Sequence, residues 1–70
     1  MITIILKCKI KDIRYELRMT QADLSKETGI TIGQISYIEN NKTYPTAYTL
    51  WIIATALKCK VDDLYQVYDN

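Results

Sequence analysis

The chain has 70 residues, which is enough for one small domain with one core. Hydrophobic residues make up 49% and charged residues 24%, with two Gly and one Pro, and this composition excludes disordered and collagen-like classes. There is no His and there are only two Cys, so the ligands of a typical zinc site and the base of a Ser-His-Asp triad are missing. We expect no enzymatic activity, no cofactor, no metal and no small-molecule ligand.

The sequence also bears on the location of the protein. Its apolar runs are far shorter than the roughly 20 residues that cross a bilayer. No basic region precedes the N-terminal apolar stretch, as it would in a secretory signal peptide. We expect a cytoplasmic protein whose cysteines, Cys8 and Cys59, are reduced thiols.

Charge is unevenly distributed, although the net charge is only +1. Residues 1–20 carry five basic and two acidic side chains, a net +3, whereas residues 61–70 carry −3. A clearly basic face would favour a nucleic-acid partner, but a net charge this small selects no partner by itself.

The N-terminal half begins with a strand pattern and continues with a helix pattern. Residues 1–7 are rich in β-branched side chains and alternate, which predicts a short strand. Apolar residues then recur at helical spacing at Ile10, Ile13 and Leu17, and this predicts an amphipathic helix over residues 9–18.

Two short helices are predicted next, on either side of a glycine turn. Thr20 is a suitable N-cap for a helix that begins at Gln21, and Gly29 can end it in the left-handed conformation. Thr31 is the N-cap of a third helix, which ends near Asn40.

The C-terminal part predicts two more helices. Thr46 follows a proline and caps a fourth helix with one apolar stripe. Val61, Leu64 and Tyr65 then fall at helical spacing behind two aspartates, which predicts a short fifth helix. The stripe of the fourth helix consists of Leu50, Ile53, Ala54 and Leu57.

The predicted N-terminal strand needs a partner strand. The tail from Tyr65 to Tyr68 is a natural mate, and the opposite charges of the two chain ends favour their approach. The pairing can form within one chain or across a dimer, and the sequence does not choose between them.

The segment from Met19 to Pro45 has the spacing of a helix-turn-helix unit. With its flanks, from Ile10 to Tyr65, it resembles the lambda-repressor-like (Cro and XRE-type) DNA-binding family. The resemblance implies an all-α, five-helix domain over residues 1–70, with the helix-turn-helix unit at about residues 20–40 and the N-terminal strand as an addition. The positions that carry it are Ile13-Arg14, Thr20-Gln21, Leu24, Gly29-Ile30-Thr31, Ile35-Ser36, Ile38-Glu39-Asn40, Lys42, Pro45, Leu50, Ile53-Ala54, Ala56-Leu57 and Asp63-Leu64-Tyr65.

The resemblance implies that the third helix lies in the major groove of double-stranded DNA. It places Gln21 at a backbone phosphate, three residues of the third helix nearest base edges, and the loop after that helix close to phosphate. The implied DNA-binding residues are Gln21, Thr31, Ile32, Gly33, Gln34, Tyr37, Asn41 and Lys42.

Two of these positions depart from the family pattern, which often has polar residues there. Neither Ile32 nor Gly33 can hydrogen-bond a base edge through its side chain. Ile32 can contact a thymine methyl group, and Gly33 permits close backbone approach. Gln34 and Tyr37 remain as polar readers of the bases.

The resemblance also implies structural roles. Arg14 and Glu39 are expected to form a buried ion pair that holds the first helix to the third. Asn41 and Lys58 stand where the family frequently has glycine, so we expect both in the left-handed conformation.

The fourth helix has a second apolar face, which we interpret as the contact of a symmetric dimer. The chain is thus interpreted as a small dimeric regulator that reads a pseudo-palindromic site and acts as a repressor by occlusion. The alternative is a protein-interaction module of the same fold that docks a partner through Trp51. The predicted dimer residues are Tyr48, Trp51, Ile52, Thr55 and Tyr68.

Overall fold

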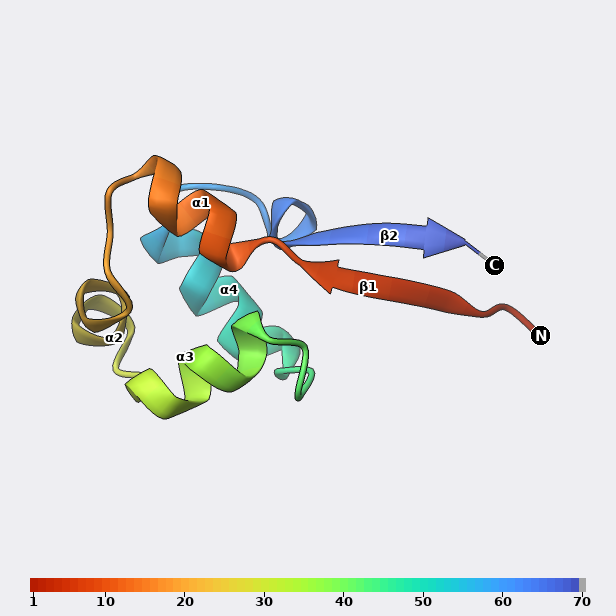
Figure 1. Cartoon of the computed structure of the whole chain (residues 1–70), viewed down its shortest axis with the longest axis horizontal. Coiled ribbons are helices and arrows are strands. Elements are labelled where there is room, and N and C mark those ends of the chain that lie inside the picture. Colours follow the sequence, from red (N-terminus) through yellow and green to blue (C-terminus); the bar gives the residue numbers. More distant parts are fainter. Residues whose placement is uncertain (70) are drawn as a thin grey trace.

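The computed structural model describes residues 1–69. Within them, four helices surround an apolar core and a two-stranded ribbon projects to one side (Figure 1). None of these helices is long and apolar enough to cross a membrane. The elements in chain order are β1 (Ile4–Cys8), α1 (Ile10–Glu16), α2 (Gln21–Thr28), α3 (Ile32–Glu39), α4 (Ala47–Ala56), the 3-10 turn η1 (Val61–Leu64) and β2 (Tyr65–Asp69).

The predicted helix starts are confirmed at three threonines. Thr20, Thr31 and Thr46 are the N-caps of α2, α3 and α4, and each side chain accepts a hydrogen bond from a backbone N–H in the first turn. Gly29 ends α2 with φ 78°. These ends are fixed by local hydrogen bonds and backbone conformation, which the sequence encodes directly.

The all-α, five-helix prediction was wrong at the C-terminus. Residues Val61–Leu64 make only a 3-10 turn, and the chain then continues as strand β2. Leu64 is fully buried and its carbonyl accepts a 2.7 Å hydrogen bond from the Lys9 N–H, which anchors the start of strand pairing. The tail YQVYD is rich in residues that favour strands, so pairing with β1 prevails over a longer helix.

The two strands pair antiparallel within the chain. The register sets Leu6 opposite Val67 and Cys8 opposite Tyr65. The predicted pairing of the N-terminal strand with the tail is therefore observed in its intramolecular form.

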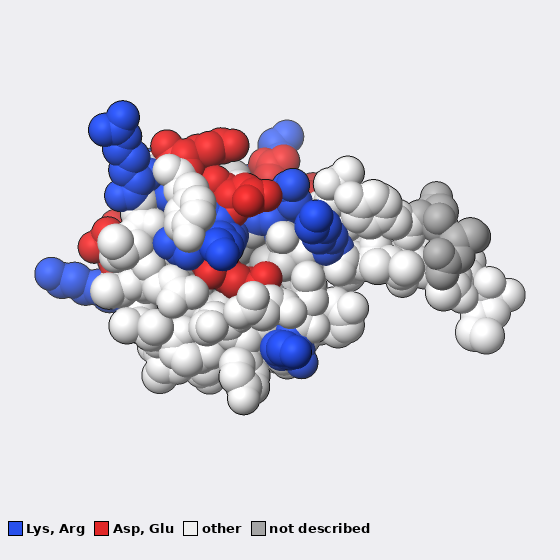
Figure 2. Space-filling model, in the orientation of Figure 1, with Lys and Arg blue, Asp and Glu red and all other residues white. Residues whose placement is uncertain are grey.

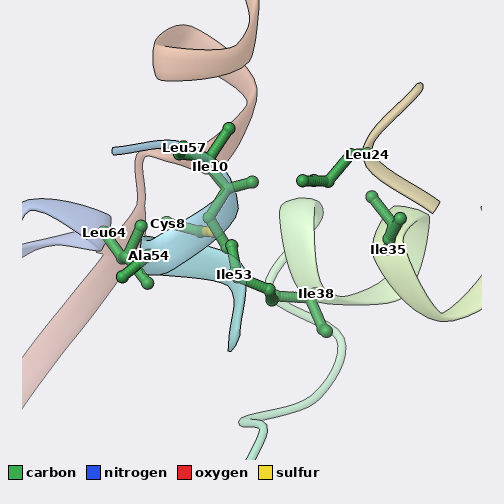
Figure 3. Close-up of a cluster of buried hydrophobic side chains, with 9 residues drawn as sticks. All are labelled: Cys8, Ile10, Leu24, Ile35, Ile38, Ile53, Ala54, Leu57 and Leu64. Atoms are coloured by element: carbon green, nitrogen blue, oxygen red, sulfur yellow. The ribbon is translucent and has the colours of Figure 1, made fainter. Parts of the chain in front are cut away.

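Side chains from both ends of the chain meet in one core. Leu24 and Ile35 join α2 to α3, and Ile53 on α4 lies between them and the base of the ribbon (Figure 3). The core consists of Cys8, Ile10, Leu24, Ile35, Ile38, Ile53, Ala54, Leu57 and Leu64. It fixes the angle between α2 and α3, which is the geometry that a helix-turn-helix unit requires.

Within residues 1–69, three residues other than glycine adopt the left-handed conformation. Asn41 and Lys58, with φ of 58° and 57°, were predicted to do so, and Arg18 with φ 56° is a third. Each lies just after a helix, where a left-handed residue turns the chain away from the helix axis.

Candidate nucleic-acid interface

Helices α2 and α3 are joined by the three-residue turn from Gly29 to Thr31. Leu24 on α2 and Ile35 on α3 are both buried, so the two helices are held by their apolar faces. The opposite face of α3 is uncovered. The pair is thus a rigid unit that presents one helix to an external partner.

The exposed face of α3 begins at its first turn. Ile32 is 48% exposed and Tyr37 is 64% exposed, while Ile35 and Ile38 point into the core. Gly33 has no heavy atom within 4 Å of the place where a Cβ would stand. Packing therefore does not require glycine at this position, and glycine lowers the stability of a helix. Ile32, Gly33 and Tyr37, which were predicted to lie nearest base edges, are all exposed, and their contact with DNA stays a prediction.

Gln34 is held by the N-cap of its own helix. Its Oε1 accepts hydrogen bonds of 3.2 Å from both the backbone N–H and the hydroxyl of Thr31, and its backbone N–H donates to the Thr31 hydroxyl over 3.1 Å. This reciprocal capping box leaves only the amide N–H groups of the Gln34 side chain for another partner. Gln34 was predicted as a polar reader of the bases, and its role in the capping box was not predicted.

The N-terminus of α2 lies beside the start of α3. The backbone N–H groups of Gln21 and Ala22 have no hydrogen-bond partner among the described residues, as expected in the first turn of a helix. Asp23 completes a capping box with Thr20, and the hydrogen bond from the Thr20 N–H lowers the pKa of the Asp23 carboxyl. Two donors at this end of α2 thus remain open to an external acceptor.

A buried ion pair between α1 and α3 contacts this end of α2 through Gln21. Arg14 donates to the Glu39 carboxylate from Nε over 2.9 Å and from Nη2 over 3.1 Å. Gln21 Nε2 donates to the same carboxylate over 2.9 Å, which fixes the orientation of the Gln21 amide and leaves its second N–H free. The hydrogen bonds to Glu39 raise the pKa of Arg14. The predicted pair is present, and it positions Gln21 as well as joining α1 to α3.

An open cleft between α1 and α2 leads to Gln21. Three basic residues, Lys11, Arg14 and Arg18, line it together with Tyr15 and Ile32. Two cations lie near the Tyr15 ring, with Lys11 Nζ 5.7 Å and Arg14 Cζ 4.9 Å from its centroid. Lys11 and Tyr15 were not among the predicted DNA-binding residues. Their helical spacing on α1 was the available signal.

The loop after α3 has one structural and one open position. The Asn41 side-chain oxygen accepts a 3.1 Å hydrogen bond from the backbone N–H of Cys8, so this residue ties the loop to the base of the ribbon. Lys42 is exposed and forms no ion pair with the side chains of residues 1–68. Of the two residues in this loop that were predicted to contact phosphate, Lys42 is the one whose side chain is available to an external partner.

The distribution of charge differs between the two sides of the molecule. Figure 2 shows basic and acidic side chains mixed around α1, whereas the surface over α3 is uncharged apart from one basic side chain. The only acidic residue of α3, Glu39, is buried against Arg14. A polyanion can therefore approach α3 without facing an exposed carboxylate from that helix.

The predicted dimer residues fall in two places. Tyr48 and Trp51, 76% and 65% exposed, line a shallow depression with Ile52, Thr55 and Glu27. Tyr68 lies on β2, in the projecting ribbon, and is not part of this surface (Figure 1). The predicted set thus divides into a surface on α4, made of Tyr48, Trp51, Ile52 and Thr55, and one residue of the ribbon.

Comparison with known proteins agrees with this geometry. A sequence profile of a helix-turn-helix family matches residues 10–64, from the start of α1 to the end of η1. The chain belongs to this helix-turn-helix family. Two proteins of Archaeoglobus fulgidus, both described as uncharacterized HTH-type transcriptional regulators, are similar to it. One is 28% identical over 65 residues, covering 93% of this chain and 90% of the relative, and the other is 26% identical over 65 residues, covering 93% and 91%. The helix-turn-helix match covers all four helices and leaves the ribbon strands outside it.

Proposed function

We propose that this helix-turn-helix protein is a transcriptional regulator that binds double-stranded DNA with α3 in the major groove. The observation that carries the proposal is the uncovered face of α3, with Ile32 and Tyr37 exposed next to the open N–H groups of α2. A major groove about 12 Å wide admits one helix. The names of the two archaeal relatives support the regulatory part of the proposal.

In this proposal the protein recognises bases largely through apolar contacts. Ile32 packs on the 5-methyl group of thymine, and Gly33 lets the backbone of α3 approach the floor of the groove. The Tyr37 hydroxyl and the Gln34 amide N–H groups supply the hydrogen bonds to base edges. Such a surface favours sites with thymine under the start of α3.

Phosphate contacts set the register on the duplex. The Gln21 side chain, held by Glu39, and the open N–H groups at the start of α2 bind one phosphate. Lys11 and Arg18 line the cleft beside Gln21, and Lys42 follows α3 in the next loop. Their small number predicts a modest dependence of affinity on salt.

We further propose that two copies bind together and that occupancy of the site represses transcription. Helix-turn-helix dimers read two half-sites about one helical turn apart, so the target is an inverted repeat. The α4 surface was predicted from the sequence as the contact between copies, and it stays a prediction.

Selection from random duplex DNA tests this function. The full chain is incubated with the pool, and recovered duplexes are titrated again at two salt concentrations. We expect an enriched inverted repeat that is bound more weakly at the higher salt concentration. A folded protein that enriches no sequence and shows no salt-dependent binding contradicts the proposal and favours protein docking on the α4 surface.

A further inference from the structure

Two exposed aromatic side chains of α4 have no part in the DNA contact proposed above. Tyr48 and Trp51 are neighbours on one side of the helix, and both are largely exposed. They line a shallow depression of about 330 Å³ between α2 and α4. Among the described residues, none of α3 lines it, so a molecule bound there does not cover the exposed face of α3.

The polar groups of this depression are acceptors. Glu27 is the only charged residue among those that line it, and it forms no ion pair with the side chains of residues 1–68. Thr55 donates the proton of its hydroxyl to the Trp51 carbonyl over 2.7 Å. A hydroxyl has one proton, so toward a ligand Thr55 can only accept a hydrogen bond. A carboxylate, a hydroxyl acceptor and two aromatic rings around one depression are a combination that favours a cation.

We infer that this depression binds the arginine side chain of a partner protein. A planar guanidinium stacks on the face of an aromatic ring and presents its N–H donors to a carboxylate in a fixed, bidentate arrangement. Lysine fits less well, because its ammonium is a compact and strongly hydrated charge. We call the polar and aromatic part of the depression the arginine site, which consists of Glu27, Tyr48, Trp51 and Thr55.

The size and composition of the arginine site agree with this occupant. Ligand pockets range from about 300 to 1,000 Å³, and this depression is at the lower end, so it suits one side chain rather than a large ligand. Tryptophan, tyrosine and arginine are the residues that most often carry the binding energy of protein interfaces. An exposed tryptophan beside an unpaired carboxylate thus has the features of an anchor point for a partner.

The chain itself does not supply this arginine. It has two arginines, Arg14 and Arg18. Arg14 is buried against Glu39. Arg18 lines the cleft beside Gln21, which is proposed to face DNA. A two-fold contact centred on the arginine site would bring Glu27 from both copies and no cation from its lining, so a protein of different sequence is the better complement.

Peptide selection with the full chain tests the arginine site. A displayed library of random short peptides is selected on the purified protein, and the strongest binder is synthesised and titrated. We expect the selected peptides to share one arginine. The chain has a single tryptophan, so the fluorescence of Trp51 should change as the peptide binds.

Glu27→Gln removes the charge of the site and keeps its shape. The variant should bind the selected peptide at least about 10-fold more weakly. The matched control is Glu16→Gln, at an exposed glutamate of α1 outside the site, and it should change the affinity less than about twofold. Citrulline in place of the peptide arginine should weaken binding at least about 10-fold for the wild type but less than about threefold for Glu27→Gln, because the two groups contact each other.

Three results would overturn the inference. The selection may enrich no arginine, Glu27→Gln may have no more effect than Glu16→Gln, or citrulline may cost the wild type and Glu27→Gln the same affinity. Enrichment of purely apolar peptides would assign the surface to an apolar contact, such as one with a second copy. Because no DNA is present in these measurements, their outcome is independent of the proposed function.

Discussion

Arg14 and Glu39 form a buried ion pair that joins α1 to α3, with Arg14 Nη1 also donating to the Met19 carbonyl over 2.9 Å. Three separate features depend on it: the packing of α1, the orientation of α3 and the position of the Gln21 amide. A helix-turn-helix unit needs all three to be rigid. The pair therefore links stability to DNA binding in this chain.

Removing one partner of this pair should strongly destabilise the folded protein. Arg14→Met leaves the Glu39 carboxylate buried without its cation, which costs about 3–5 kcal/mol. That is comparable to the whole stability expected of a small domain, so the variant should be largely unfolded at 25 °C. Urea unfolding followed by circular dichroism measures this. The double variant Arg14→Met/Glu39→Leu should regain most of the stability, and equal stability of the single and double variants would show that the pair is not a buried unit.

Gln21→Ala tests the phosphate contact. The variant loses one hydrogen bond to Glu39, so the free energy of unfolding should fall by only about 1 kcal/mol. Affinity for the selected duplex should fall about 10-fold, while the slope of affinity against salt concentration stays the same because glutamine carries no charge. The control Glu27→Ala, on the side of α2 that faces the α4 surface, should leave affinity within about twofold. Equal effects of both variants would mean that Gln21 has no contact of its own.

Gly33→Ala should raise the stability of the protein and lower its affinity for DNA. The site has open space for a Cβ and an ordinary helical φ, so alanine should stabilise the protein by about 0.5–1 kcal/mol. The same methyl group would stand between α3 and the groove floor and should lower DNA affinity about 10-fold. Gly29→Ala is the matched control, because φ of 78° makes alanine destabilising there. A Gly33→Ala protein that binds DNA as well as the wild type would exclude close backbone approach.

Replacement of thymine by uracil tests apolar readout by Ile32. Loss of one buried methyl group costs about 0.8 kcal/mol, or roughly a fourfold loss of affinity at the contacted position. Ile32→Ala should bind the unmodified duplex more weakly and should no longer distinguish uracil from thymine there. Titrations of a duplex series with single replacements measure both effects. Unchanged discrimination by Ile32→Ala would assign the methyl contact to another residue.

The buried hydroxyl of Tyr65 should make the folded protein less stable at alkaline pH. Its hydroxyl is buried without a hydrogen-bond partner; the Cys8 thiol lies beside it but not in hydrogen-bonding geometry. Burial is the main cause that raises the Tyr65 pKa from 10.0 to about 12. The folded state thus holds this proton more tightly than the unfolded state, and the corresponding stability is present below pH 10 and is lost as the pH rises toward 12.

Tyr65→Phe should remove this dependence. At neutral pH the variant should be as stable as the wild type or more stable by about 1 kcal/mol, because an unsatisfied buried hydroxyl is removed. Between pH 10 and pH 12 it should lose less stability than the wild type, as thermal unfolding across this range will show. Tyr37→Phe, at an exposed tyrosine, is the control and should follow the wild type. A Tyr65→Phe curve that parallels the wild type would contradict the burial of this hydroxyl.

Much of the fold could be predicted from local sequence signals. The ends of α2, α3 and α4 follow from Thr20, Thr31, Thr46 and Gly29, because caps and left-handed turns depend on a few neighbouring residues. The fifth helix could not be excluded in this way. Val61 and Leu64 fit a helical spacing, and only pairing of the tail with β1, a long-range contact, makes the following residues a strand.

The candidate site was predictable in outline and less so in its hydrogen bonds. The exposed face of α3 follows from helical periodicity. The engagement of Gln34 by Thr31 and of Gln21 by Glu39 depends on side-chain geometry, which spacing alone does not give. The uncovered state of the ribbon could not be predicted either, because its alternating pattern is the same for a covered strand and an open one.

Nuclear magnetic resonance can show whether α3 and the N-terminus of α2 contact DNA. The backbone amides of the full chain are followed while the selected duplex or a scrambled duplex is added. We expect the selected duplex to perturb the amides of residues 20–23 and 31–37 most strongly, and the scrambled duplex to perturb them less and only at low salt. Perturbation centred on the ribbon or on the α4 surface, or none at all with the selected duplex, would contradict it.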